Sequence, residues 1–499
     1  MVRGTRVGSA SRLPEARRRG RGRLNEKRPR LPPDSPVLEL ADAIRLRGGR
    51  VIIVGGWVRD RLLGKVSHDL DLEVFGVSRA SLSEWLGDFG FSPPVGRRFP
   101  VWRQTRLGID VGFPRGGTEA IDPGVRPESA DADDPRSLAR AFRAAARHRD
   151  LTINAIGWDP LADRLFDPFE GRSDLAAGRL RAVDESTFGA DPLRVLRVAR
   201  LHAELAADVD PTLRRLCREV ELDSLPVERI AGELRRLLIE GARPSSAFEF
   251  LAEVGQLEVF GPLARLRGIP QDPRWHPEGD VFVHTLQVVD RAAEIARPLP
   301  EGQREALLLA ALCHDFGKAQ ETRVEGDRIR AHGHEATGAD IARDWLALLR
   351  LPDRLVRAVG ALVANHLAPM HLPRQDAGAG AYRRLARKLA LAGVTVVDLE
   401  RLARADHLGR EAEGRPAAGF PEGQRFLEAA RAAGVGEGVP PDVVSASCLL
   451  EAGIEPGPRL GELLARCREI QDEIGSRDPE AILERVMDRT RPDGGAGQD

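Results

Sequence analysis

The sequence predicts a multidomain α+β protein, in which a mixed α/β domain with a small sheet is followed by an all-helical remainder. Short apolar runs such as VIIVGG and LGIDVGF alternate with helical stretches up to about residue 180. From about residue 185, apolar residues recur at three- and four-residue spacings, as in RIAGELRRLLIEGA. The chain has 499 residues, 42% of them hydrophobic, which is enough for several packed cores.

The overall composition excludes some classes of protein. No run of about 18 apolar residues occurs, so we expect no membrane-spanning helix. The four cysteines form no CxxC pair, which argues against a disulfide framework and fits a reducing cytoplasm. The formal net charge is -1, so the overall charge indicates no particular partner.

Basic residues cluster near the start of the chain, between Arg17 and Arg30. We expect residues 1–36 to form a disordered, arginine-rich tail, because a run of like charge is usually solvated. The alternative is an electrostatic arm that binds RNA. The segment lacks the apolar core of a secretory signal.

An alternating acidic stretch, HDLDLEV, contains the first candidate site. Asp69, Asp71 and Glu73 are two residues apart, so in a strand their side chains share one face of the sheet. Neighbouring carboxylates are suitable oxygen ligands for divalent cations. A pair of such ions can activate a hydroxyl and stabilise a leaving phosphate. The alternative interpretation is a solvated strand face.

Two glycines, Gly55 and Gly56, follow the apolar run VIIV where a strand is predicted to turn into a helix. Their missing side chains would let backbone N–H groups approach a triphosphate at the helix N-terminus. Arg59 could add a forked contact to the phosphate oxygens. A glycine pair after a strand is also a common turn, so the evidence lies in the joint order of strand, glycines, helix, turn and DxD.

That order, GGWVRDRLLG followed by HDLDLEV, resembles the bacterial tRNA nucleotidyltransferase and poly(A) polymerase family, the class II CCA-adding enzymes of the DNA polymerase β superfamily. Four further stretches follow in the family's order. They are LGIDVGFPR, RHRDLTINAIGWD, DPFEGRSDLAAGRLRAV and FGADPLRVLRVARL. His148 and Ala190 stand where the family usually has arginine and glutamate, which bears on base selectivity more than on catalysis. The resemblance covers roughly residues 50 to 265.

The resemblance implies a reaction and assigns residues to it. An RNA 3′-hydroxyl would attack the α-phosphate of CTP or ATP and release pyrophosphate, with tRNA as the partner. Asp69 and Asp71 would hold Mg²⁺, and Asp110 would act as a further ligand or as the base. Asp191 and Arg194 would read the edge of the incoming base. The implied nucleotide-binding residues are Gly55, Gly56, Arg59, Arg149, Asp191, Arg194, Arg197 and Arg200; for the last two, a salt-bridged helix face is the alternative.

Eight of the eleven histidines fall between His276 and His407. Adjacent histidine and aspartate in LLLAALCHDFGKA are costly to bury unless a metal or hydrogen bonds satisfy them. The set resembles an HD phosphohydrolase domain, which implies hydrolysis of a phosphomonoester or a 2′,3′-cyclic phosphate by a metal-bound water. The implied metal is Mg²⁺ or a transition metal such as Ni, Mn or Co. The implied ligands are His284, His314, Asp315 and Asp406 for one metal and His334 and His366 for a second, with His332 as the rival of His334.

The motifs divide the chain into five predicted parts. These are a basic tail (1–36), a nucleotidyltransferase head (37–180), a helical neck (181–268), an HD domain (269–412) and a helical RNA-binding tail (413–499). The polar stretch DPRWHPEGDV (272–281) is predicted to be a domain junction. The stretch LLEAGIEPGPRLGELLARC resembles a family helix that grips the tRNA body.

The leading hypothesis is a tRNA 3′-end nucleotidyltransferase that carries an HD domain. A close alternative is a poly(A) polymerase, or a partial enzyme that adds only CC or only A. An alternative of another class is an HD phosphohydrolase with a nucleotide-binding head, and a third is a non-enzymatic RNA-binding scaffold. The sequence leaves the oligomeric state open.

Overall fold

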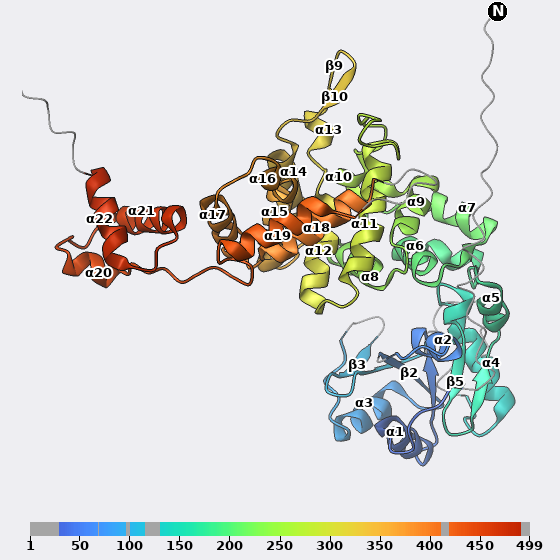
Figure 1. Cartoon of the computed structure of the whole chain (residues 1–499). Helices are drawn as coiled ribbons and strands as arrows, with labels where there is room; N and C mark the ends of the chain where they lie inside the picture. Colours follow the sequence, from blue (N-terminus) through green and yellow to red (C-terminus); the bar gives the residue numbers. More distant parts are fainter. Residues whose placement is uncertain (1–28, 68, 96–99, 115–129, 411–418, 491–499) are drawn as a thin grey trace, which may run out of the picture. The chain divides into compact units, whose positions relative to one another are not determined.

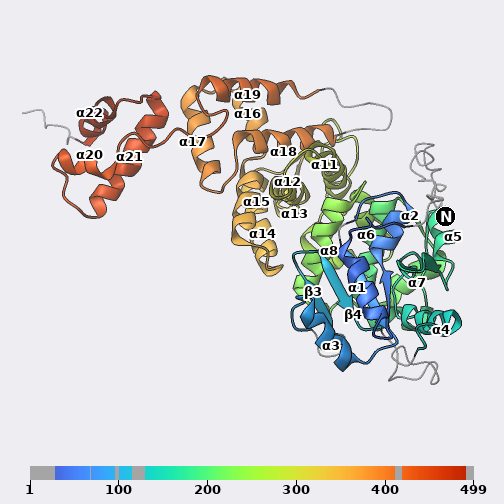
Figure 2. The same cartoon turned by 90° about the horizontal axis from the view of Figure 1, so that it is seen from below.

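The computed structural model describes residues 29–67, 69–95, 100–114, 130–410 and 419–490 (Figures 1 and 2). Most of the predicted basic tail lies outside the described residues. The chain divides into two compact units, Met1–Ser224 and Leu225–Asp499. This boundary lies inside the segment predicted as the neck, and the finer five-part division remains a prediction.

The first unit is built on a mixed sheet whose six described strands have the order β3-β4-β2-β1-β5-β6. Strand β2 pairs antiparallel with β1 and parallel with β4. The strands are β1 (Arg50–Val54), β2 (Leu70–Phe75), β3 (Val101–Gln104), β4 (Ile109–Gly112), β5 (Gly157–Asp159) and β6 (Arg164–Phe166). The predicted mixed α/β head with a small sheet is confirmed.

The burial of strand β2 follows the pattern of its sequence. Leu72 and Val74 of β2 are buried, while Asp71 and Glu73 between them are not. Phe75, two residues after Glu73, is on the same face as the carboxylates and is buried together with Phe142 from helix α4 (Pro135–Ala146). Asp71 and Glu73 therefore lie on the face that α4 covers, at the less buried start of β2.

Helices and short elements complete the first unit (Figure 1). Helix α2 starts directly after β1, and α6 carries the motif predicted to recognise the base. The elements are α1 (Pro36–Arg45), α2 (Gly56–Leu62), α3 (Arg79–Asp88), η3 (Thr152–Asn154), α5 (Gly171–Ala177), β7 (Arg179–Leu180), η4 (Glu185–Ala190), α6 (Leu193–Leu205), β8 (Asp208–Val209) and α7 (Pro211–Glu219).

The second unit is helical apart from one small hairpin, as far as the described residues show. Helices α11, α12, α15 and α18 contact one another and form the bundle that carries the histidines (Figure 2). This part comprises α8 (Val227–Glu240), α9 (Ser245–Glu253), η5 (Leu257–Phe260), α10 (Gly261–Ala264), α11 (Val281–Ala296), α12 (Glu301–Cys313), α13 (Lys318–Glu321), β9 (Arg323–Glu325), β10 (Arg328–Arg330), α14 (His334–Leu348), α15 (Asp353–Asn365), α16 (Ala368–Arg374), α17 (Ala379–Ala390), α18 (Val396–Leu408) and α19 (Pro421–Ala432).

The last helices share a small apolar core of their own. They are α20 (Ala446–Glu451), α21 (Pro458–Ile474) and α22 (Pro479–Thr490). Leu449, Leu463 and Ile482 are buried against one another there. Among the described residues, no helix is both long and apolar enough to cross a membrane.

Candidate functional site

The first site is formed by carboxylates on adjacent strands of the sheet. Asp71 of β2 lies directly opposite Asp110 of β4 in the parallel register, so their side chains are on the same face. Asp69 lies just before β2, and its charge helps to raise the pKa of Asp71. The three predicted carboxylates are thus brought together by one strand pair.

The electrostatics of Asp71 indicate a site built to receive positive charge. Water reaches its side chain, yet surrounding protein partly desolvates the carboxylate and raises its pKa. Arg149 opposes this shift, while Asp110, Asp69 and Glu73 add to it. Several carboxylates facing one another repel, and a divalent cation would relieve that repulsion.

Arg103 on β3 was not predicted from the sequence and contacts the third carboxylate. Its Nε and Nη2 donate to the two oxygens of Asp110 at 2.8 and 2.6 Å. The pair is bidentate, which is the strong geometry for guanidinium and carboxylate. Arg103 is 63% exposed, so water weakens the pair. Asp110 therefore has a cationic partner that a metal ion would have to replace.

The site requires glycine at position 55. Gly55 lies between β1 and α2 with a φ of 76°, a conformation that side chains disfavour. A Cβ atom there would also lie 3.1 Å from Oδ2 of Asp71 and 3.5 Å from Nη1 of Arg149. Any side chain at this position would therefore crowd the Asp71 carboxylate.

Arg149 forms a second wall of the site. Its Nη2 donates to Oε1 of Glu73 at 2.6 Å. Burial alone would lower the pKa of Arg149, but the carboxylates of Glu73 and Asp71 outweigh it and raise that pKa. The guanidinium is therefore permanently charged beside the acids, where it can contact a phosphate.

A pocket extends from these carboxylates to the start of α6 and lies wholly within the first unit. Asp191 and Arg194, the residues predicted to read the base, both line it. Arg194 is buried, and its guanidinium donates to the carbonyl oxygens of Thr187 (2.8 Å) and His148 (2.6 Å), which fixes its orientation. The lining residues are Val54, Asp71, Leu72, Glu73, Pro100, Val101, Asp110, Gly112, Phe113, Ala145, His148, Arg149, Asp150, Asp191, Arg194 and Arg197.

The predicted phosphate contact of Arg59 is not what this structure shows. Arg59 is buried and does not line the pocket. Its three nitrogens donate to protein acceptors: Asp60 at 2.8 Å, Asn154 at 3.1 Å and Glu204 at 3.2 Å. These partners already accept from the donors of the guanidinium, and the contact with Glu204 links α2 to α6. Gly55 and Gly56 are likewise absent from the lining.

The predicted basic stripe on α6 ends after Arg197. Arg197 lines the pocket and pairs with Asp150 at 2.7 Å, whereas Arg200 is buried and pairs with Glu204 at 2.8 Å. Three-residue steps on a helix drift by about 60° each, so Arg200 has rotated away from the face of Arg194. The salt-bridge alternative applies to Arg200.

The second site lies in the helical bundle of the second unit and is buried. The ligand atoms of the predicted residues form two groups whose members lie within 4.8 Å of one another. Nε2 of His314 and Nε2 of His334 lie 3.2 and 3.3 Å from different oxygens of Asp315, so Asp315 can serve both groups. The groups are His284, His314 and Asp406, and Asp315, His334 and His366.

Two cations compensate the carboxylates of this site. Lys318 lies 2.7 Å from Asp315, and Arg410 lies 2.9 Å from Asp406. Burial alone would raise the pKa of both aspartates, but His314 and Lys318 beside Asp315, and Arg410 and His284 beside Asp406, lower both pKa values. Both carboxylates are therefore ionised, as metal ligands must be.

The structure separates the two rival histidines. His334 is buried beside Asp315, whereas His332 is exposed. Burial, followed by the neighbouring His334 and His314, lowers the pKa of His366 to about 3. His366 is therefore neutral at physiological pH, which is the form that binds metals.

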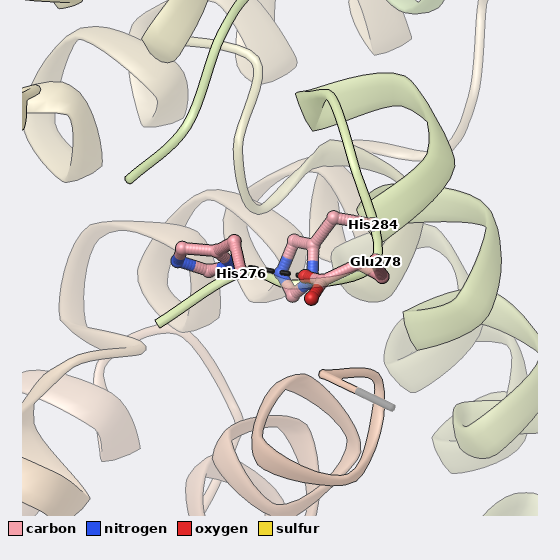
Figure 3. A group of neighbouring side chains, drawn as sticks. All are labelled: His276, Glu278 and His284. Atoms are coloured by element: carbon pink, nitrogen blue, oxygen red, sulfur yellow. Dashed lines mark hydrogen bonds and ion pairs between the residues drawn. The ribbon is translucent and has the colours of Figure 1, made fainter. Parts of the chain in front are cut away.

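Sequence reasoning missed two residues that contact this site. The segment 272–281, predicted to be a junction, supplies His276 and Glu278. The Glu278 side chain has no exposed surface, and its Oε1 lies 2.9 Å and 2.8 Å from His276 and His284 (Figure 3). The signal was a short His-x-Glu pattern six residues before His284. Because the residues around this pattern are polar and include proline, the segment resembles a linker.

Both donor sets fit divalent cations. The head offers only carboxylate oxygens, the ligands that Mg²⁺ prefers. The buried cluster offers imidazole nitrogens and carboxylates, a mixture suited to transition metals. Fold and sites therefore define the class of protein: a nucleotidyltransferase that carries an HD domain.

Comparisons with known families agree with that class. The Poly A polymerase head domain matches residues 109–181, and the HD domain matches residues 281–407. A multifunctional CCA protein of Cupriavidus metallidurans is 34% identical over 77% of this chain and 90% of its own length. One from Paracidovorax citrulli is also 34% identical, over 87% of this chain and 99% of its own. The chain belongs to the multifunctional CCA protein family.

Solved structures share the fold along nearly the whole chain. A Bacillus stearothermophilus CCA-adding enzyme in complex with CTP aligns with a TM-score of 0.60 at 22% identity, over 92% of this chain and 98% of that one. A Thermotoga maritima CCA-adding enzyme complexed with tRNA gives 0.55 at 18% identity, over 92% and 96%.

Proposed function

We propose that this protein adds C and A nucleotides to the 3′ end of tRNA, using CTP and ATP and releasing pyrophosphate. The observation that supports it most is the alignment of Asp71 with Asp110 at the edge of a pocket lined by Arg149, Arg194 and Arg197. That arrangement joins a cation site to a positively charged wall, as transfer of a nucleotidyl group requires. The similarity to the CCA proteins and CCA-adding enzymes named above also supports the proposal.

The carboxylates define the reacting end of the pocket. Asp69 and Asp71 would hold Mg²⁺, with Asp110 as a third ligand or as the base for the 3′-hydroxyl. When bound, Mg²⁺ would supply charge neutralisation on the triphosphate and activation of the hydroxyl. Gly55 leaves the space beside Asp71 open for the phosphates, and Arg149 stabilises their negative charge.

The other end of the pocket would select the base. Asp191 accepts hydrogen bonds and Arg194 donates them, so the pair can match the edges of cytosine or adenine without a nucleic-acid template. Backbone carbonyls hold the Arg194 guanidinium rigidly, which favours discrimination by hydrogen-bond direction.

The test is nucleotide incorporation into tRNA that lacks its 3′ CCA, with CTP and ATP supplied singly and together. The proposal expects two C residues with CTP alone and a complete CCA with both nucleotides. A long A tract with ATP alone would indicate a poly(A) polymerase. Termination after CC, or addition of A only to tRNA ending in CC, would indicate a partial enzyme.

We also propose that the HD domain hydrolyses a phosphomonoester or a 2′,3′-cyclic phosphate. The supporting observation is the buried cluster of four histidines and two aspartates, whose charges are balanced by Lys318 and Arg410. When bound, a divalent metal would supply the attacking hydroxide. Asp315→Asn should abolish hydrolysis of 2′,3′-cyclic AMP and p-nitrophenyl phosphate while nucleotide incorporation continues; hydrolysis that continues unchanged would refute the proposal.

A further inference from the structure

Three of the four buried histidines of the HD site are oriented in the same way. Nδ1 of His314, His334 and His366 lies 2.8, 2.7 and 2.7 Å from the backbone carbonyl oxygen three residues earlier. His314 and His366 cap the C-termini of α12 and α15, and His334 begins α14. Carbonyl oxygens at these helix ends have spare acceptor capacity, so each Nδ1–H is satisfied and each Nε2 faces the site.

His284 cannot use this device. It lies in the first turn of α11, where carbonyl oxygens point into the helix. The carbonyl of Val281, three residues earlier, accepts instead from the Thr285 hydroxyl at 2.8 Å. Nδ1 of His284 lies 2.8 Å from Oε1 of Glu278, a carboxylate with no exposed surface (Figure 3).

The opposite nitrogen of His284 belongs to the metal-binding group. Its Nε2 lies 3.1 Å from Oδ1 of Asp406 and 3.4 Å from Nε2 of His314. A neutral imidazole has a lone pair on only one nitrogen, so Nε2 can bind a metal only while Nδ1 carries the proton. We propose that Glu278 is a positioning residue of the HD metal centre, which accepts the Nδ1–H of His284 and holds its Nε2 toward the metal.

His276 also contacts Glu278 but does not belong to the metal-binding groups that contain Asp315 and Asp406. Its Nδ1 lies 2.9 Å from the same oxygen of Glu278, and its ring stands edge-on to His284 at a centroid distance of 4.8 Å. Glu278 thereby receives two polar contacts, which offset the cost of burying its charge. The segment 272–281 is thus tied to the metal centre through one carboxylate.

The alternative role for these atoms is a separate metal site made of His276, Glu278 and His284. With the HD metal also bound to Nε2, it would require His284 to lose its last proton and bind a cation through each nitrogen. Loss of that proton is far less favourable than donation to an adjacent carboxylate. Donation from Nδ1 of His284 to Glu278 is therefore favoured over a separate metal site.

The test measures metal binding and rests on the proposed HD metal centre. Isothermal titration of metal-stripped full-length chain with Mn²⁺ would use an Asp71→Asn background, so that the head does not contribute. Glu278→Ala should weaken binding about 10- to 100-fold without changing the number of ions bound. Glu278→Gln, which keeps an acceptor oxygen, should be intermediate.

Glu335→Gln is the matched control, because Glu335 lies 3.5 Å from Nδ1 of His334, which already has a carbonyl acceptor. It should leave the affinity unchanged. Affinity equal to the parent in both Glu278 variants would overturn the positioning role, and loss of one bound ion would assign the separate site instead. Binding that survives Asp315→Ala unchanged would refute the HD metal centre itself, so the two failures are distinguishable. In an Asp71 wild-type background, retained nucleotide incorporation would report that each variant folds.

Discussion

Asp71 and its neighbours show how single residues set the chemistry of the head. The DxD pattern correctly predicts that acids share a sheet face, because strand alternation is a local property. It does not predict the Asp110 partner, since Arg103 comes from another strand. It also misassigns Arg59, whose acceptors Asn154 and Glu204 lie about a hundred or more residues away in sequence.

The first prediction concerns Gly55. Gly55→Ala should reduce nucleotide incorporation at least tenfold, because its Cβ would lie 3.1 Å from Asp71 and its φ of 76° disfavours a side chain. Gly64→Ala is the matched control: it has a φ of 73°, with no atom within 4 Å of its Cβ. Equal activities of the two variants would show that crowding at Asp71 does not matter.

The second prediction concerns Arg103. If its guanidinium competes with Mg²⁺ for Asp110, Arg103→Gln should lower the Mg²⁺ concentration for half-maximal incorporation about two- to fivefold. The range is modest because an exposed ion pair contributes about 1 kcal/mol or less. The measurement is a Mg²⁺ titration of initial rates. A higher Mg²⁺ requirement would indicate that Arg103 supports the site instead.

Individual elements follow from the sequence wherever the pattern is local. Strands β1 and β2, helix α2 and the amphipathic helices match the predicted stretches. The contact made by the stretch 272–281 was not predicted, because its Glu278 lies beside His284, six residues further along the chain, in a polar context typical of a linker. Arg200 does not share the pocket face with Arg194, because residues three apart do not stay on one face of a helix.

A third prediction tests the link between α6 and the loop that precedes η3. Burial alone would raise the pKa of Asp150, but Arg197, Asn154 and the N–H of Leu151 outweigh it and lower the pKa to about 2. Because the folded value lies below the ordinary 3.8, this carboxylate stabilises the fold above about pH 4 by roughly 2 kcal/mol. That stabilisation is lost as the pH falls toward 2.

Asp150→Asn should therefore lower the melting temperature at pH 7, and the difference from the parent protein should shrink as the pH falls toward 3. Melting curves at a series of pH values provide the measurement. Arg197→Gln in both backgrounds gives a double-mutant cycle with a clear coupling energy at pH 7. A difference that is constant with pH would contradict the assigned role of Asp150.

At the scale of the whole molecule, one chain carries two candidate metal sites in two compact units. The nucleotide pocket lies within Met1–Ser224 and the histidine cluster within Leu225–Asp499. The sequence motifs predict both sites and the order of the units. They do not predict the boundary near residue 224, because packing decides which helices of the predicted neck join each unit.

The most direct measurement is incorporation of labelled CTP and ATP into tRNA lacking its 3′ CCA by Asp71→Asn protein. This substitution keeps the shape of the side chain and removes the charge that would hold Mg²⁺. We predict a loss of at least a thousandfold in rate, with unchanged hydrolysis of 2′,3′-cyclic AMP. Incorporation at the parent rate would contradict the assignment of the head as the nucleotidyl-transfer site.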